Sequence, residues 1–194
     1  MRLALSLLAT LLLLSALPGI AAAEGAGTAT VRKANDQVSA LLKKQAPAAQ
    51  VTATVRTFLD IDEMGKRALS NHWATLSAAQ QKEFSTLLRE LIEAHYVKGM
   101  RSNVNYQVKY LSEKADGAGG LLVSTQVETT RKGRPFKIQI DYRLRREKGA
   151  WKVYDVVTDG VGMVENYRAS FNKIIAKDGF AGLLERMRKK KATI

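Results

Sequence analysis

Four segments between residues 103 and 158 alternate apolar and polar side chains, and this period of two limits the fold more than any other feature of the sequence. Short turns that contain glycine separate the segments, and strands joined by such turns pair antiparallel. One face of the resulting sheet is dry and the other is wet. The residues expected on the dry face are aromatic or β-branched: Tyr106, Val108, Val123, Val127, Phe136, Ile138, Ile140, Tyr142 and Val153.

Segments with helical spacing flank the predicted strands. Apolar residues three and four apart predict helices on both sides, over residues 31–42, 51–59, 61–72, 78–96, 164–175 and 180–187. The pairs Asp60 with Glu63 and Ser77 with Gln80 have the spacing of capping boxes and locate two helix starts. This order predicts an α+β fold, in which helices cover a curved four-stranded antiparallel sheet.

The chain begins with an apolar run, Leu3 to Leu14, which follows one positive charge and precedes alanines at 21–23. The run is too short to span a bilayer, and signal peptidase accepts such small residues, so residues 1–23 are predicted to be a cleavable signal peptide. We expect residues 24–30 to form a flexible leader and residues 31–194 to form one domain. The sequence contains no cysteine, which excludes a disulfide, a thiolate metal site and lipid attachment through a cysteine.

The formal net charge of +13 at neutral pH attracts anions, among them acidic proteins, phospholipid headgroups and nucleic acid. Predicted export and the lack of a nucleic-acid-binding motif argue against nucleic acid as a partner. The basic tail at residues 186–191 is interpreted as a solvated helix end whose charges suit the helix dipole. A second interpretation is that the tail contacts acidic partners or anionic headgroups.

The sequence has no recognisable catalytic or metal-binding motif. Its two histidines, His72 and His95, lack metal-ligand spacing, and we interpret each as a core or interface residue. The aspartates of the last two strands and the following turn are interpreted as salt-bridge or turn residues: Asp141, Asp155 and Asp159. We therefore expect no enzyme activity, no cofactor and no metal. The alternative is a small enzyme on a nuclear-transport-factor-like scaffold that pairs a histidine with an aspartate.

Two interpretations of the dry face are open. In the first, its side chains pack on the helices and fill the interior. In the second, the sheet and its helical cover enclose an apolar cavity, for which this arrangement is a common place. The cavity would be lined by residues of the helices, the strands and the corner that follows: Phe84, Leu88, Leu91, Tyr106, Val108, Val123, Val127, Phe136, Ile138, Ile140, Tyr142, Val153, Val164 and Tyr167.

Short motifs in a fixed order extend over residues 31–190. The first half contains Asp60-Ile61-Asp62-Glu63-Met64, and the second half contains Asp141-Tyr142-Arg143-Leu144, Trp151-Lys152-Val153-Tyr154-Asp155-Val156, Gly160-Val161 and Asn166-Tyr167-Arg168. In these motifs the chain resembles the MlaC family, also called the toluene-tolerance family. Its members are periplasmic phospholipid-binding proteins that serve as auxiliary components of an ABC transport system. Hopanoid-associated relatives share much of the pattern.

This resemblance implies a soluble periplasmic carrier, expected to be a monomer, that holds the acyl chains of a phospholipid in the cavity. It would shuttle the lipid between an inner-membrane ABC complex with an MCE-domain subunit and an outer-membrane lipoprotein complex. The alternative is a relative that carries a hopanoid or another apolar ligand. We expect Arg143, Asp155 and Arg168 to form the pocket mouth near the headgroup, with Tyr167 closing the cavity. Such a carrier needs no catalytic residue.

Overall fold

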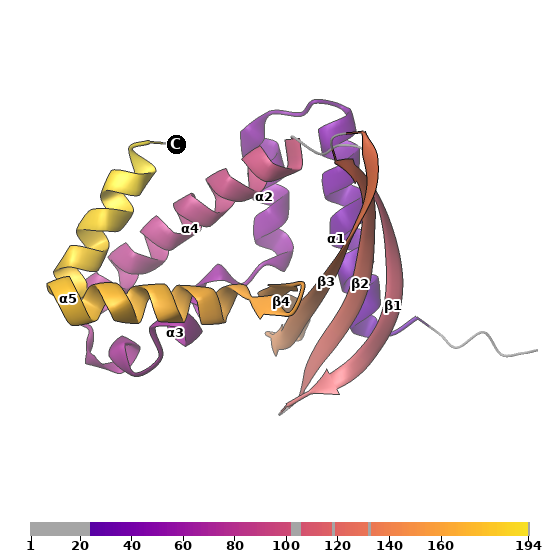
Figure 1. Ribbon diagram of the computed structural model, residues 1–194. Coiled ribbons are helices and arrows are strands. Elements are labelled where there is room, and N and C mark those ends of the chain that lie inside the picture. Colours follow the sequence, from indigo (N-terminus) through magenta and orange to yellow (C-terminus); the bar gives the residue numbers. More distant parts are fainter. Residues whose placement is uncertain (1–23, 102–105, 118, 132, 194) are drawn as a thin grey trace, which may run out of the picture.

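The computed structural model describes residues 24–101, 106–117, 119–131 and 133–193, without the side chains of residues 96–101 and 131. The predicted signal peptide, residues 1–23, lies outside the described residues. A curved antiparallel sheet stands on one side of the molecule, and the helices gather on the other (Figure 1). The predicted α+β class is therefore confirmed. Within the described part of the chain, no helix combines the length and the apolar character needed to cross a membrane.

The helical layer precedes and follows the sheet in the chain. Its elements are α1 (Ala26–Lys43), α2 (Ala48–Phe58), α3 (Ile61–Leu69), the 3-10 helix η1 (Ser70–Thr75), α4 (Ala78–Arg101) and α5 (Met163–Lys191). The sheet contains β1 (Tyr106–Asp116), β2 (Gly120–Arg131), β3 (Arg134–Glu147), β4 (Ala150–Thr158) and β5 (Val161–Gly162). Sequential strands pair antiparallel in the order β1-β2-β3-β4-β5. The meander thus has a fifth strand that was not predicted, because two residues are too few to show an alternation.

The first turn of α1 corrects the prediction of a flexible leader at residues 24–30. This helix begins at Ala26, and its own first turn contains no acidic residue. Glu113 of β1 supplies the acidic group instead. Its carboxylate accepts hydrogen bonds from the backbone N–H of Thr28 at 2.7 Å and from the Thr28 hydroxyl at 2.8 Å. A carboxylate at a helix N-terminus satisfies free N–H groups and suits the helix dipole. The partner lies 85 residues away in the chain, so local sequence does not reveal it.

One hydrophobic core joins the helices to one face of the sheet, which we call the inner face. On the sheet side of this core, the exposed fractions of Val123, Leu144 and Val153 are between 0 and 1 %. On the helical side, the Phe84 ring packs edge-on against Phe171 with centroids 5.5 Å apart. Such edge-to-face pairs add to the energy of burial. The core therefore fixes where α1 and the α3–α4–α5 group lie relative to the sheet.

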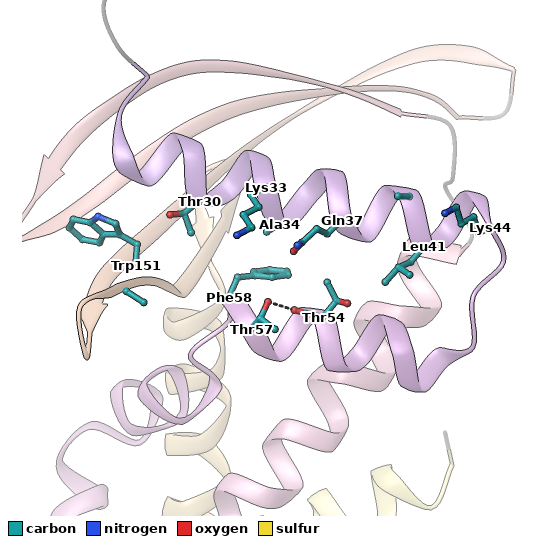
Figure 2. Close-up of a pocket in the computed structure, with 12 residues that line it drawn as sticks. Thr30, Lys33, Ala34, Gln37, Leu41, Lys44, Thr54, Thr57, Phe58 and Trp151 are labelled. Carbon is teal, nitrogen blue, oxygen red and sulfur yellow. Dashed lines mark hydrogen bonds between the residues drawn. The ribbon is translucent and has the colours of Figure 1, made fainter.

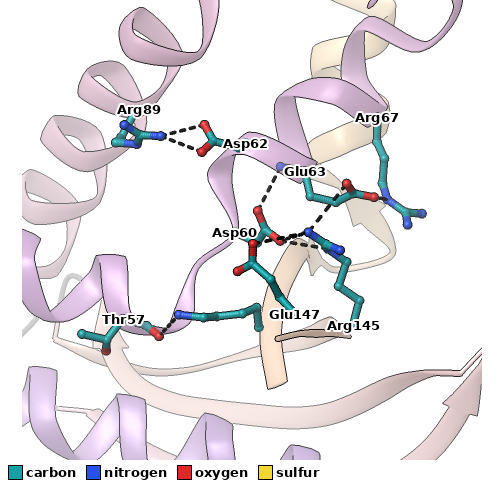
Figure 3. A network of polar contacts seen from close by, with 9 residues as sticks. Thr57, Asp60, Asp62, Glu63, Arg67, Arg89, Arg145 and Glu147 are labelled. Carbon is teal, nitrogen blue, oxygen red and sulfur yellow. Dashed lines mark hydrogen bonds and ion pairs between the residues drawn. The ribbon is translucent and has the colours of Figure 1, made fainter. Parts of the chain in front are cut away.

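Polar contacts attach α3 to the edge of the sheet beside β4. Asp60 begins α3 by accepting a hydrogen bond from the Glu63 backbone N–H at 3.0 Å, as the predicted capping box requires. The reciprocal contact differs, because the Asp60 N–H donates to the Val153 carbonyl at 2.7 Å. Arg145 of β3, whose side chain is 32 % exposed, donates to the buried Asp60 carboxylate, and this pair lies at the centre of a wider network (Figure 3). Breaking one partner of such a pair leaves an uncompensated charge, so the pair fixes the position of α3.

The corner between β4 and α5 is held by one carboxylate. Asp155, which is 6 % exposed, accepts a hydrogen bond from the Val164 N–H at 3.0 Å in the first turn of α5. The chain turns before this point through Asp159 and Gly160, which both have positive φ. Farther along, α5 bends at Gly179, whose φ of 69° and ψ of 177° are not helical. This bend agrees with the predicted division between a helix over 164–175 and one over 180–187.

Candidate functional site

Part of the inner face lies outside the buried core. Tyr106 contacts α1 through a 3.0 Å hydrogen bond from its hydroxyl to the Asn35 side-chain oxygen, which shows that its side chain faces inward. Strand alternation and register place the neighbours of Tyr106 on the same face. We call this group the apolar strip, and it comprises Tyr106, Val108, Val127, Ile138 and Ile140. All five are half-buried, and none belongs to the core formed by the described residues.

The remaining predicted cavity residues are not part of the apolar strip. Fully buried in the core are Phe84, Leu88, Val123, Val153 and Val164. Partly buried and packed against the core are Leu91, Tyr142 and Tyr167, and Phe136 is half-buried beside the strip. The inner face is thus filled near Val123 and Leu144 and less completely covered near Val127 and Ile138. The filled-interior interpretation therefore holds near Val123 and Leu144, whereas a cavity along the rest of this face stays a prediction.

Two tyrosines on the inner face of β1 contact α1. The Arg32 guanidinium lies 4.0 Å from the centroid of the Tyr110 ring, which is a cation–π distance. Burial raises the pKa of Tyr110 to about 12, although the Arg32 charge acts in the opposite direction. Burial also raises the pKa of Tyr106. Both phenols therefore stay neutral at physiological pH, as an apolar environment favours.

The predicted mouth residues meet in one pocket at the corner of β4, β5 and α5. Arg143, Asp155 and Arg168 all line this space of about 470 Å³, together with Arg67 and Tyr154. Three guanidinium groups therefore lie around it, from α3, β3 and α5. We call it the arginine pocket. Three of its residues are the predicted mouth residues, whereas the sequence did not indicate Arg67, which comes from a helix far away in the chain.

Each arginine of this pocket also has a partner within the protein. Arg168 pairs with Glu165 at 3.0 Å instead of Asp155, because Asp155 is engaged at the start of α5. Arg143 lies 3.5 Å from Asp116, and the Arg67 guanidinium stacks on the Tyr154 ring at 4.1 Å.

Arg143 alternates with the inward-facing residues of β3, so it faces the opposite side of the sheet. The arginine pocket and the apolar strip therefore lie on different faces. The structure does not place the predicted mouth next to the strip.

A groove between α1 and α2 was not predicted. It has a volume of about 770 Å³ and ends at the β3–β4 turn with Trp151 (Figure 2). Its lining on α1 mixes small, apolar and basic side chains, so it has no simple amphipathic pattern that would distinguish it in the sequence. Residues of α1 and the residue that follows it recur at helical spacing along the groove: Thr30, Lys33, Ala34, Gln37, Ala40, Leu41 and Lys44.

The histidines have no acidic partner among the described residues. His72 contacts the Asn172 side chain at 3.1 Å, and His95 is exposed rather than part of the core or an interface within the chain. Among the described residues, no three His, Cys, Asp or Glu side chains gather as a metal site would require. The basic tail is largely neutralised within the protein, because Arg186, Lys189 and Lys191 pair with carboxylates at 2.5 to 2.8 Å.

Comparison with known proteins gives consistent results. The family model of the MlaC protein matches residues 28–189. The intermembrane phospholipid transport system binding protein MlaC of Haemophilus influenzae is 26 % identical over 131 residues, which are 67 % of this chain and 61 % of that protein. The chain thus matches less than two thirds of the length of this relative.

A solved structure shares the fold. It is a phospholipid-binding protein from Ralstonia solanacearum in complex with a phospholipid, with a TM-score of 0.75 and 24 % sequence identity. The match covers 87 % of this chain and 98 % of the other. The two proteins therefore have the same arrangement of sheet and helices.

Proposed function

The chain belongs to the MlaC family, and we propose that it is a carrier that binds a phospholipid and moves it between two membranes. The observation that carries this proposal is the apolar strip, whose five inward-facing side chains are left outside the core in a family of lipid-transport proteins. The relative from H. influenzae is named for phospholipid transport and the solved structure from R. solanacearum contains a phospholipid, which supports the choice of ligand.

Hydrophobic transfer energies explain what the carrier supplies. Each methylene group exposed to water costs about 0.8 kcal/mol, so a two-chain lipid with roughly thirty of them crosses water extremely slowly by itself. An apolar protein surface replaces membrane hydrocarbon, and extraction then approaches thermal neutrality. Transport direction must come from partners. The carrier itself needs a surface that shelters acyl chains.

We place the acyl chains against the apolar strip and the residues beside it on the inner face. Filled parts of that face, such as Val123 and Val153, would close the end of the binding space. The arginine pocket is separated from the strip by the sheet, so a headgroup role for Arg143 and Arg168 requires a test of its own. Replacing both with glutamine should lower the amount of bound lipid only if the headgroup reaches that pocket.

The surroundings of the carrier are also proposed. The predicted signal peptide supports a periplasmic location. The family supports exchange of lipid with an inner-membrane ABC complex that has an MCE-domain subunit and with an outer-membrane lipoprotein complex. The net charge of +13 would favour approach to acidic partner surfaces and anionic membranes.

The first test is native mass spectrometry of the protein purified from bacteria, followed by organic extraction. We expect co-purified phospholipid in the unmodified protein. The variant Val127→Trp with Ile140→Trp should fold and lose lipid, because indole rings would occupy the space beside the strip. Gln139→Trp is the matched control, since this exposed residue of β3 points to the opposite face. A protein that contains no lipid and does not respond to delipidation would contradict the proposal.

A further inference from the structure

The groove between α1 and α2 has the shape of a helix-binding site. The two helices form a hairpin joined by residues 44–47, and the groove runs along their exposed side (Figure 2). Its floor includes the buried residues Ala34 and Phe58, and the small side chain of Ala40 also lines it. The lining extends over residues 30–44 of α1, which is about 21 Å at 1.5 Å per helical residue. That length matches about four turns of a bound helix.

The charge of the groove has one sign. Lys33 and Lys44 line it, and no carboxylate does. Within the part of the chain that the structure describes, neither lysine forms an ion pair. The two lie eleven residues apart, which is three helical turns or about 16 Å, and therefore on the same side of α1. Gln37 lies between them on that side. A ligand that complements the groove has anionic groups at two separate points.

The end of the groove contains the indole ring of Trp151. The indole nitrogen of Trp151 is enclosed and has no hydrogen-bond acceptor among the described residues. The Arg146 guanidinium lies 5.0 Å from the centroid of the same ring, which adds positive charge at this end.

We propose that this groove is a docking site for an amphipathic helix of a partner protein, with apolar residues on one side and acidic residues along both edges. Two neighbouring helices leave a valley into which a third can pack, and the alanines permit the usual spacing of 8–10 Å between helix axes. An apolar helix face that lies in such a groove is a common mode of recognition. A lipid with one anionic headgroup would neutralise one lysine and leave the other. A second copy of this chain, which has a net charge of +13, would be repelled.

The docking site does not depend on the proposed lipid site. The apolar strip is on β1, β2 and β3, whereas the groove is formed by α1, α2 and the start of β4. A protein without lipid can therefore still bind the helix, and a protein with a blocked groove can still hold lipid.

The test uses the full chain and a labelled probe. The probe is an 18-residue helical peptide with leucines on one face and glutamates on both flanks, and its binding is followed by fluorescence anisotropy. We expect saturable binding that weakens at least tenfold in the variant Lys33→Glu with Lys44→Glu. The control is Lys173→Glu with Lys177→Glu, which changes the net charge equally at exposed positions of α5 and should bind within twofold of the unmodified protein.

Three results would overturn the proposal. The first is no binding of the peptide to the unmodified chain, and the second is equal binding by the Lys33→Glu, Lys44→Glu variant. The third is displacement of the peptide by oleate at submicellar concentration, which would assign the groove to an amphiphile. Lipid content is measured in each variant by extraction, so that loss of the peptide site is distinguished from loss of the lipid site.

Discussion

Single carboxylates on the sheet hold the first turns of two helices. Glu113 holds α1 from 85 residues away in the chain, and Asp155 holds α5 from nine residues before its hydrogen-bond partner Val164. Neither helix has a side-chain cap of its own at the preceding residue, which is glycine in both cases. The positions of α1 and α5 on the sheet therefore depend on residues whose main contribution is to hydrogen bonding rather than to packing.

Removal of the Glu113 carboxylate should loosen α1. We expect Glu113→Ala to lower the free energy of unfolding by about 1–2 kcal/mol, because the first-turn N–H of Thr28 loses its acceptor. The measurement is urea denaturation. Lys114→Ala, an exposed change on the same strand, is the control and should have almost no effect. An equal loss in both variants would argue against the capping role.

The Tyr110 hydroxyl should lose its proton at a higher pH than an exposed tyrosine does. Its pKa in the folded protein, about 12, lies above the ordinary value of 10 because burial disfavours the phenolate. The neutral phenol therefore contributes stability that is complete below pH 10 and is lost as the pH rises from 10 to 12. Absorbance titration at 295 nm should show late phenolate absorbance that is smaller in Tyr110→Phe, where Tyr106 still titrates above the ordinary value. A complete titration with all tyrosines near pH 10 in the folded protein would contradict this environment.

At the scale of elements, α3 and α4 approach closely at a glycine. A Cβ atom built at Gly65 would lie 2.7 Å from a Leu88 methyl carbon and 2.9 Å from the Phe84 ring. We expect Gly65→Ala to destabilise the protein by about 1–3 kcal/mol, since overpacking exceeds the gain in helix propensity. Thermal unfolding measures the change. Lys66→Ala on the exposed side of α3 is the control, and a stabilised Gly65→Ala protein would show that this contact is loose.

Elements with a clear period were predictable from the sequence, and contacts over long distances were not. The alternation in β1 to β4 and the spacing in α4 gave the α+β fold, because both patterns reflect one buried face. The start of α1 was missed, since Glu113 is in another element. The reciprocal capping box of Ser77 with Gln80 was found, with hydrogen bonds of 2.9 and 3.3 Å, because both partners are local.

The candidate sites, too, were predictable from the sequence only in part. Arg143, Asp155 and Arg168 were grouped because the family resemblance implied a pocket mouth near the headgroup, and the structure brings them into one pocket. Alternation along β3 already separates Arg143 from the inward-facing residues, whereas the pairing of Arg143 with Asp155 beside the bulge depends on the register and could not be predicted from the sequence. The groove was not found because Lys33 and Lys44 have the appearance of an ordinary solvated helix face.

At the scale of the whole molecule, some basic side chains are paired with carboxylates and others are not. Much of the basic tail is paired with acidic residues of α4 and α5, such as Glu90 and Glu185. The lysines of the α1–α2 groove are unpaired among the described residues. We therefore expect acidic partners to be attracted more to the groove than to the basic tail. The second interpretation from the sequence assigned this role to the tail.

Three surfaces of the molecule have different proposed tasks. The apolar strip would shelter acyl chains, the groove would receive an acidic helix, and the arginine pocket would offer guanidinium groups on the opposite face of the sheet. The central claim is that the acyl chains lie against the strip.

Cross-linking with a photoreactive lipid tests that claim most directly. Protein loaded with a phosphatidylethanolamine that has a diazirine near the end of one acyl chain is irradiated, digested and mapped by mass spectrometry. We predict cross-links in the β1, β2 and β3 peptides that contain Val108, Val127 and Ile138. Cross-links concentrated in α1 between Thr30 and Lys44, or around Arg143 and Arg168, would contradict the account.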